Sequence, residues 1–535
     1  MPKYMLLLVL IVAMGGVALA APVIYYVSPS GDDANTGLSM ATAWRSIARV
    51  NAAPLDPGNV VKFQGGAAFP GSLLITRSGT APARIVITSY PTAAGARAEI
   101  LAGDGDGNVI EDAEYVRVKS LTITGAGIAT NRGYGILLNR TLAGPTPLRS
   151  IQIDRVETRA FYYTGIAFYG GAVPVGYSGL RVTNADVHDN GYAGLWMGGC
   201  NGPPGSYCFK NVYVGYSAFH DNHGIDIPEQ TGNGIFFKDV DGGTIEHCLA
   251  YNNGDLNRNL TGGPVGIWAI FSNRVIIQFN EAWNNNSKKN DGDGFDFDAG
   301  VTNSIMQYNY SHDNYCAGFM LWDWHDIMQS NHNIVRYNIS ENDSKRPICG
   351  GLRIGTAGPG RIMNTQIYGN TIYAGRNNNA PALEIAGGRF SGITIRNNIF
   401  MASSGSRVMT NRGGVGVVLQ GNAYWNSGPL KIVWRGIGYG TLAAWRLATG
   451  QERLGTVETG FEVDPQLDAP GEGGTINDTR NLGSLTAYML TAASPLIDEG
   501  LDLPALGIAP GRWDFYGNAV PQGAGFDVGA HDRGL

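Results

Sequence analysis

The sequence has few charged residues, few cysteines and no excess of basic side chains. Only 15% of its 535 residues are charged, and the formal net charge is −6. A mild negative charge argues against nucleic acid as a partner, because phosphate binding requires clustered lysine and arginine. The five cysteines include no CxxC pair and no Cys/His spacing typical of zinc. We therefore expect neither a nucleic-acid partner nor a zinc site.

Long apolar runs are absent after the first 20 residues. At the start, Lys3 supplies a positive charge, an apolar core follows, and Ala18-Leu19-Ala20 forms a small-residue cleavage pattern. The apolar run is shorter than the roughly 20 residues of a membrane-spanning helix, which disfavours a membrane anchor. Residues 1–20 therefore predict a signal peptide cleaved near Ala20. We expect a secreted protein, extracellular or periplasmic, with no membrane partner after cleavage.

The sequence is rich in glycine, and one short phrase recurs with it. A glycine (once an alanine) is followed by apolar residues at alternate positions, at intervals of 24 to 40 residues. The phrase begins at Gly135, Gly165, Gly194, Gly234, Gly266, Gly294, Gly318, Gly351 and Ala382. A repeat of this length made of strand-like units, without helical heptads, predicts a solenoid.

A column of asparagines supports the same period. Its members lie 24 to 32 residues apart: Asn280, Asn309, Asn338, Asn370, Asn398 and Asn422. Stacked asparagines hydrogen-bond from one coil to the next and tolerate the left-handed backbone of tight turns. The column therefore predicts that the coils stack in register.

The repeats and the asparagine column resemble a right-handed parallel β-helix of the pectate-lyase-like superfamily. The resemblance covers nearly the whole chain after residue 20 and implies an all-β solenoid with N-terminal and C-terminal caps. We expect an N-terminal entry region at residues 21–114, coils at 115–425, and an irregular segment with the C-terminal cap at 426–535. Residues 442–450 predict a short helix ending at Gly450. Capped β-helices are commonly monomers, so we expect a monomer.

The cysteines can form disulfide pairs, which is consistent with a secreted protein. Cys316 and Cys349 each stand two residues before a template glycine in neighbouring coils. Parallel strands lie about 4.8 Å apart, which is within reach of a disulfide. Cys200 and Cys208 bracket a Pro/Gly-rich loop and form a second candidate pair. Cys248 is left over, and we expect it to be buried.

One repeat departs from the template by its acid content. Asp291, Asp293, Asp296 and Asp298 fall within eight residues. Because strand side chains alternate faces, Asp296 and Asp298 point away from Phe295 and Phe297. Four carboxylates so close together repel one another unless a cation, a basic neighbour or a substrate offsets the charge. Ca²⁺, which prefers several oxygen ligands, is one candidate, and a hydrogen-bonded acidic turn without metal is the alternative.

The outward positions of the template predict a carbohydrate-binding strip. Aromatic residues lie on both sides of the acidic repeat, and sugar rings stack on aromatic faces. The candidate substrate-binding residues are Trp196, Phe236, Trp268, Trp322, Asp323 and Glu384. The strip spans about eight strand steps, roughly 40 Å, which suits an extended polysaccharide. The alternative is that loops cover these aromatic residues and they are merely packed.

Three basic residues near the acidic repeat are further catalytic candidates. Arg353 either clamps a substrate carboxylate or pairs with Glu384 one coil on. Lys238 is a candidate base, although it lies next to Asp239 and a solvated role is the alternative. His325 stands close to Asp323 and Asp326 in the coil after the acidic strand, which favours a role in the site.

The phrase from Asp293 to Asp296 resembles the DGFD or DGWD calcium strand of secreted pectate and rhamnogalacturonan lyases. In that family Ca²⁺ bridges enzyme and substrate carboxylate, and a lysine removes the C5 proton before β-elimination. Carried over, Asp293 and Asp296 become metal ligands. The chain departs from the family where Met320 replaces the catalytic lysine, and Arg353 in the next coil is the substitute base. A lyase acting on a uronic-acid polysaccharide, or a related C5-epimerase, is the leading expectation.

Two alternatives stay open. A glycoside hydrolase on the same scaffold requires two suitably spaced carboxyl groups, and Asp296 and Asp298 fit the wider, inverting range of roughly 6.5–9.5 Å. A non-catalytic carbohydrate-binding or surface protein is also compatible with the fold.

Overall fold

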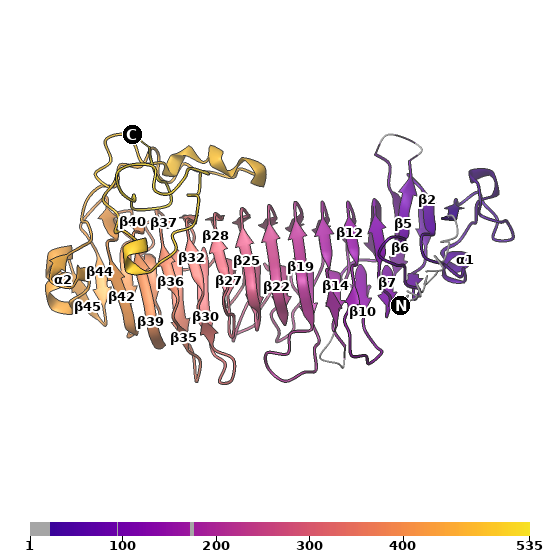
Figure 1. Cartoon of the computed structure of the whole chain (residues 1–535), viewed down its shortest axis with the longest axis horizontal. Coiled ribbons are helices and arrows are strands. Elements are labelled where there is room, and N and C mark those ends of the chain that lie inside the picture. Colours follow the sequence, from indigo (N-terminus) through magenta and orange to yellow (C-terminus); the bar gives the residue numbers. More distant parts are fainter. Residues whose placement is uncertain (1–21, 92, 94, 172–175, 535) are drawn as a thin grey trace, which may run out of the picture.

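The computed structural model describes residues 22–91, 93, 95–171 and 176–534. The predicted signal peptide at residues 1–20 lies outside the described residues. Short strands stack in parallel into three long sheets, which form an elongated β-helix (Figure 1). The predicted all-β solenoid is confirmed. Within the described ranges, no helix is both long enough and apolar enough to cross a membrane.

The three sheets run the length of the molecule and are named here A, B and C. Sheet A contains β1(Ile24–Val27), β2(Val60–Gln64), β5(Ile85–Tyr90), β8(Val116–Lys119), β11(Leu148–Arg149), β12(Gln152–Asp154), β15(Tyr177–Ser178), β16(Arg181–Thr183), β19(Phe209–Gly215), β22(Val240–Glu246), β25(Asn273–Gln278), β28(Ile305–Gln307), β31(Ser330–Asn331), β32(Ile334–Arg336), β35(Ile362–Met363), β36(Gln366–Tyr368), β39(Arg389–Arg396) and β42(Val415–Gln420). Sheet B contains β3(Ala68–Pro70), β6(Ala98–Gly103), β9(Leu121–Gly125), β13(Glu157–Arg159), β17(Asp186–His188), β20(Ala218–His220), β23(Leu249–Tyr251), β26(Glu281–Trp283), β29(Tyr310–His312), β33(Ile339–Glu341), β37(Thr371–Ala374), β40(Ile399–Ala402) and β43(Ala423–Asn426). Sheet C contains β4(Leu73–Ile75), β7(Asn108–Glu111), β10(Ile136–Asn139), β14(Thr164–Tyr169), β18(Ala193–Gly198), β21(Asn233–Lys238), β24(Val265–Ile270), β27(Asp293–Phe297), β30(Phe319–Asp323), β34(Leu352–Thr356), β38(Pro381–Ile385), β41(Arg407–Asn411), β44(Ile432–Trp434) and the antiparallel β45(Ile437–Tyr439).

The recurring glycine phrase forms sheet C with the predicted register. The residue after each template glycine pairs with its counterpart in the next coil, as in Ile267 with Phe295 and Phe295 with Phe319. These apolar residues are buried inside the coils. A side chain at Gly294 would meet the Ser311 Oγ at 2.3 Å and the Asn314 Nδ2 at 2.9 Å. The glycine is therefore required because this position faces the crowded interior.

The predicted asparagine column forms a buried ladder. The Nδ2 of each member from Asn280 to Asn398 donates to the Oδ1 of the next, ending on Asn422, at 2.8–3.0 Å. The same Oδ1 also accepts the backbone N–H of the preceding member. Each asparagine thus satisfies buried backbone groups as well as its neighbours.

A second ladder, which the sequence analysis did not identify, runs along the turn before sheet C. It joins Asn190, Asn222, Asn253, Asn285 and Asn314 at 2.9–3.0 Å, and ends on the carboxylate of Asp343 at 2.8 Å. Three of its members, Asn190, Asn222 and Asn314, each follow a His-Asp pair in the sequence. This ladder lies between sheets B and C in the coils of β18, β21, β24, β27 and β30.

Both ends of the stack differ from a regular coil. The parallel pairing already begins between β1 and β2, so much of the predicted entry region at residues 21–114 is regular coil. Near the start, the chain forms the short helix α1(Ile47–Asn51), preceded by the short helix η1(Met40–Thr42). At the other end, α2(Leu442–Thr449) stops at the left-handed Gly450, as predicted.

The C-terminal segment folds back along the outer face of sheet B (Figure 1). It contains β46(Arg453–Leu454), β47(Val457–Glu458), η2(Thr479–Ser484), η3(Thr486–Tyr488) and η4(Pro504–Leu506). The Glu281 carboxylate accepts the backbone N–H groups of Ile476 and Asn477 at 2.7 Å, and Glu341 accepts that of Gly473 at 3.0 Å. The segment therefore covers the outer face of the late coils and leaves sheet C uncovered.

The ladder predicts a large penalty for removing one member. Asn309→Ala removes a donor to Ile277 and Asn338 and leaves the N–H of Asn280 unpaired in the interior. We expect the free energy of unfolding to fall by about 3 kcal/mol, measured by urea denaturation. The matched control is Asn201→Ala at an exposed position, where we expect little change. Equal effects of the two substitutions would contradict a ladder-specific role.

Candidate functional site

The acidic repeat forms strand β27 in the middle of sheet C. Asp296 pairs with Trp268 in the preceding coil and with Met320 in the following one. Phe295 and Phe297 fill the interior, so Asp296 and Asp298 point outward from the sheet, as predicted. The acidic groups are thus held on the most regular part of the fold.

A cavity of about 550 Å³ lies over this strand. The acidic groups Asp291, Asp296 and Asp298 face it, and Arg353 lies on its other side. The rest of the lining comes from loops before and after sheet C and from aromatic side chains: Gln230, Leu260–Gly263, Val265, Trp268, Asn290, Met320, Trp322, Trp324 and Ala357. Its volume is typical of small-molecule sites.

Asp296 lies in the cavity without a hydrogen-bond partner. Its side chain is only 1% exposed, and its buried Oδ1 has no partner among the described residues. Burial raises the pKa of Asp296 well above its usual value, and the nearby carboxylates of Asp298, Asp293 and Asp291 raise it further. Burial and the neighbouring carboxylates therefore both favour the protonated form of Asp296, whose carboxyl group lines the cavity.

The carboxyl groups of Asp298 and Asp291, in contrast, accept hydrogen bonds. Asp298 accepts the backbone N–H of Ala299 at 2.7 Å and the indole N–H of Trp324 at 3.4 Å. Burial nevertheless raises the pKa of Asp298 to about 7. Asp291 accepts the backbone N–H of Gly263 at 2.7 Å, and burial likewise raises its pKa. The strand therefore offers two carboxyl groups with raised pKa values, of which Asp298 ionises near pH 7.

The fourth acid, Asp293, has a structural position. Its Oδ1 accepts the backbone N–H of Ala317, and its Oδ2 is buried without a partner. Burial, followed by the charge of Asp291, raises its pKa well above the usual value. Among the described residues, no three Asp, Glu, His or Cys side chains are grouped so that they could hold a metal ion. The described residues thus show no three-ligand group at the predicted calcium site, binding of Ca²⁺ stays a prediction, and no chemical step is assigned to a metal.

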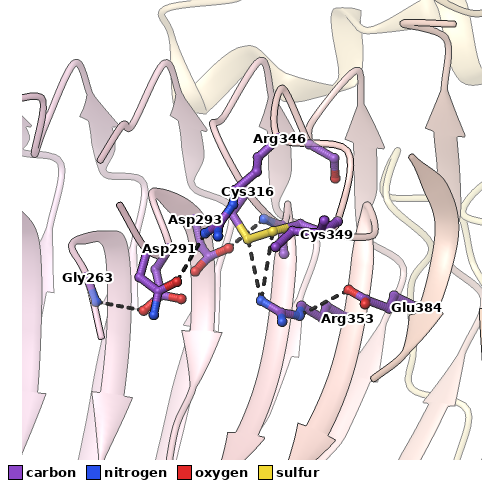
Figure 2. The surroundings of a disulfide bond; sticks show 12 residues. Gly263, Asp291, Asp293, Cys316, Arg346, Cys349, Arg353 and Glu384 are labelled. Carbon is purple, nitrogen blue, oxygen red and sulfur yellow. Dashed lines mark hydrogen bonds and ion pairs between the residues drawn. A yellow bond between two sulfur atoms is a disulfide. The ribbon is translucent and has the colours of Figure 1, made fainter. Parts of the chain in front are cut away.

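Arg353 is fixed on the far side of the acids by an ion pair and a disulfide (Figure 2). Its Nε lies 3.0 Å from the Glu384 carboxylate, which also pairs with Arg412 at 2.8 Å. One terminal nitrogen lies 3.5 Å from the Cys316 sulfur and 3.8 Å from the Cys349 sulfur. The guanidinium also lies over the Trp322 ring at 4.8 Å. The pairing of Arg353 with Glu384 is confirmed, and Arg353 also lines the cavity, so clamping of a substrate carboxylate stays a prediction.

Both cysteine pairs considered from the sequence are disulfide-bonded. Cys316–Cys349 joins the coils that follow the acidic strand, and Cys200–Cys208 closes the Pro/Gly-rich loop. Cys248 is free and buried, as expected. The first disulfide holds the backbone beside Asp293 and Arg353 in place.

The predicted aromatic strip is mostly packed. Phe236 and Trp268 stack at 4.0 Å and are only 6% and 2% exposed, in a small cluster with Val265 and Ile270. Trp268 also donates its indole N–H to Asn233. Trp268 and Trp322 line the cavity, but Trp196 and Phe236 do not. The structure thus favours the packed alternative for part of the strip. The rest of the strip lines the cavity over β27.

Asp323 and Glu384, the two acidic members of the predicted substrate-binding set, have internal partners. Asp323 is 0% exposed and accepts the backbone N–H groups of Gly300, His325 and Ser330. It therefore shapes the loop after β30, while Glu384 holds Arg353. Neither side chain lines the cavity.

Lys238 and His325 lie outside the acidic cavity and line a separate, smaller one. Trp324, which the sequence analysis passed over, lines the acidic cavity and contacts Asp298. The sequence signal that could have indicated it is the aromatic pair Trp322 and Trp324 directly after β30's apolar residues. The loop residues at 260–263 carried no such signal.

The comparisons with known proteins agree with the fold. Residues 149–372 match the family model described as "Right handed beta helix region", which confirms the predicted handedness. A curated lacto-N-biosidase of Bifidobacterium longum subsp. longum is 25% identical, over 65% of this chain but only 27% of that enzyme. The chain therefore matches about a quarter of that relative's length.

Among solved structures, a lacto-N-biosidase from Eubacterium ramulus is 18% identical with a TM-score of 0.49, covering 67% of this chain and 65% of that one. The alginate lyase AlyGC is 14% identical with a TM-score of 0.51, covering 91% and 59%. Structural likeness at this identity shows the right-handed β-helix fold alone. The chain is a right-handed parallel β-helix.

The raised pKa of Asp298 predicts a pH-dependent stability. A group whose folded pKa lies above its unfolded value binds more protons in the folded state, so stability falls as pH rises between the two values. For a pKa near 7 against about 3.9 unfolded, the wild-type protein should lose about 4 kcal/mol relative to Asp298→Asn between about pH 4 and 8. Urea denaturation of both proteins across this range measures the difference. A constant difference would contradict the raised pKa.

Proposed function

We propose that the chain is a glycoside hydrolase whose active site is the acidic cavity over β27. The observation that carries the proposal is the buried carboxyl group of Asp296, which has no hydrogen-bond partner, has a raised pKa and lines the cavity. A carboxylic acid that keeps its proton near neutral pH is what protonation of a glycosidic oxygen requires. No lysine among the described residues lines this cavity.

Asp296 acts as the general acid and Asp298 as the general base. Asp296 donates its proton to the glycosidic oxygen as the bond to the anomeric carbon breaks. Asp298 takes a proton from a water molecule, whose oxygen attacks that carbon. Asp298 suits this role because hydrogen bonds from Ala299 and Trp324 stabilise its ionised form. The two residues are two apart on one strand face, about 7 Å between Cα atoms, which is compatible with an intervening water.

The cavity supports a short carbohydrate as substrate. Its volume of about 550 Å³ suits a few sugar units, and Trp268, Trp322 and Trp324 supply apolar walls for sugar faces. The curated relative is named a lacto-N-biosidase, which supports a glycosidic bond in an oligosaccharide as the target. We further propose export through residues 1–20 and action as a monomer.

Three observations support hydrolysis over elimination as the reaction proposed for this cavity. Arg353, the base expected for a lyase, is held by Glu384 and lies against the disulfide sulfurs. Lys238 lies in a different cavity. The four aspartates do not form a metal-binding group among the described residues. A uronic-acid lyase needs a free base and a neutralised substrate carboxylate, and neither is supported at this cavity.

The decisive test is an assay on neutral and acidic oligosaccharides, recording new reducing ends and ultraviolet absorbance, with Ca²⁺ and with EDTA. We expect reducing ends without absorbance and no effect of EDTA. Asp296→Asn should lower kcat by about 10² to 10⁴, whereas Asp326→Asn, at an exposed acid outside the cavity, should leave it unchanged. Absorbance that rises with reducing ends and is abolished by EDTA would establish elimination instead.

Chemical rescue with a small anion tests which residue is the general base. Asp298→Ala and Asp291→Ala are assayed with and without added azide, a small anion that can replace a missing carboxylate. We expect azide to restore turnover to Asp298→Ala and to yield a glycosyl azide, because that substitution leaves the acid Asp296 in place. Rescue of Asp291→Ala alone would transfer the role of base to Asp291.

A further inference from the structure

A second cavity, of about 150 Å³, lies on the same side of sheet C as the acidic one. Four separate segments form it: the disulfide-closed loop after β18, the end of β21 with the residue that follows, the turn after β24, and the loop after β30. The lining residues that carry the argument are Tyr207, Lys238, Asp239, Phe271 and His325. The cavity is therefore built by residues far apart in the sequence.

Lys238 brings a positive charge to this cavity, and that charge acts on the adjacent Asp239 carboxyl group, which also lines it. No Asp or Glu of the described residues forms an ion pair with its ammonium group, whose recorded contact is the Phe271 ring at 5.8 Å. The adjacent Asp239 is partly buried, which raises its pKa to about 6. In a chain with net charge −6, a cavity-lining lysine without an ion pair points to an anionic ligand.

His325 adds a hydrogen-bond donor of fixed tautomer. Its Nδ1 accepts the backbone N–H groups of Ile327 and Met328 at 3.2 and 3.0 Å. Because Nδ1 accepts, the proton of the neutral ring resides on Nε2. The edge of the ring packs against Phe271, with ring centroids 4.8 Å apart. The cavity therefore combines a cation, an N–H donor and an aromatic wall.

One residue links the two cavities. Trp324 lines the acidic cavity and donates its indole N–H to Asp298. Its ring also packs against Phe271 of the second cavity, with ring centroids 5.9 Å apart. The strand register pairs Lys238 with Ile270, and Asp298 follows Ile270 one coil on, so Lys238 and Asp298 are two coils apart. This corresponds to about 10 Å, roughly the length of two sugar units.

We propose that the second cavity is a subsite for an acidic sugar residue, bearing a carboxylate or a sulfate, about two units from the bond that Asp296 and Asp298 cleave. Lys238 pairs with the anionic group and His325 donates to it or to a neighbouring hydroxyl. Tyr207 and Phe271 flank the ring. The position of the acidic residue relative to the cleaved bond rests on the proposed function, but binding of the anionic sugar does not.

Binding is tested in the Asp296→Asn protein, which retains the second cavity but does not turn over. The probes are a uronic-acid trisaccharide, its carboxyl-reduced form and a sulfated trisaccharide, titrated by calorimetry. We expect Lys238→Gln to weaken the acidic probes by about tenfold or more, with no effect on the carboxyl-reduced probe. Lys238→Arg should retain most of the affinity. Lys210→Gln, on the exposed surface of sheet A, is the matched control and should bind like the parent.

The outcomes separate this inference from the proposed function. Equal affinity of the acidic and reduced probes, or equal loss with Lys238→Gln and Lys210→Gln, would overturn the subsite whether or not the enzyme hydrolyses glycans. A Lys238-dependent preference for acidic probes would support the subsite even if no glycan were hydrolysed. A preference for only one of the two acidic probes would identify the anionic group as carboxylate or sulfate.

Activity gives a second readout. In the otherwise wild-type protein, Lys238→Gln should raise KM for an acidic substrate about tenfold or more and leave kcat and the neutral substrate unchanged. A loss of kcat on both substrates would indicate that the substitution disturbs the catalytic cavity through Trp324, and would contradict a binding role.

Discussion

The structure depends on coils that stack in strict register. Two ladders of asparagine side chains and the parallel strand hydrogen bonds place equivalent residues of successive coils directly above one another. Without the ladders, the buried backbone groups at the turns would have no partners. Residues about 30 positions apart in the sequence thereby become neighbours, and every feature of the acidic cavity follows from this adjacency.

The stacked coils also offset the loss of stability that the buried acids cause. Asp293 and Asp296 hold buried carboxyl oxygens without partners, which destabilises the folded state. The strands on either side pair with β27 in register, and the Cys316–Cys349 disulfide and the Glu384 ion pairs brace the coils that follow. A regular scaffold can thus tolerate one irregular, acidic strand and hold it in a single arrangement.

Much of the fold could be predicted because its signals are periodic. The template glycines and Asn280 to Asn422 repeat in the sequence at the spacing of one coil, so their register was correct strand by strand. The second ladder was missed because only three of its five members follow a His-Asp pair, whereas Asn253 and Asn285 each follow another asparagine and interrupt the repeated phrase. The acidic strand was identified from composition. The burial of Phe236 and the grouping of Lys238 with His325 in one cavity were not predictable, since they depend on the paths of non-repeating loops.

The register also makes the distance between the two cavities a discrete quantity. Lys238 and Asp298 belong to strands β21 and β27, with β24 between them. The second cavity takes Lys238 from β21 and His325 from the loop after β30, so it spans the same coils that separate Lys238 from Asp298. A whole coil duplicated in this interval would move Lys238 away from Asp298 by one strand spacing, about 4.8 Å, and would separate Lys238 from His325 by the same step. The shape of the second cavity and its distance from Asp298 can therefore change only together, and only by whole coils.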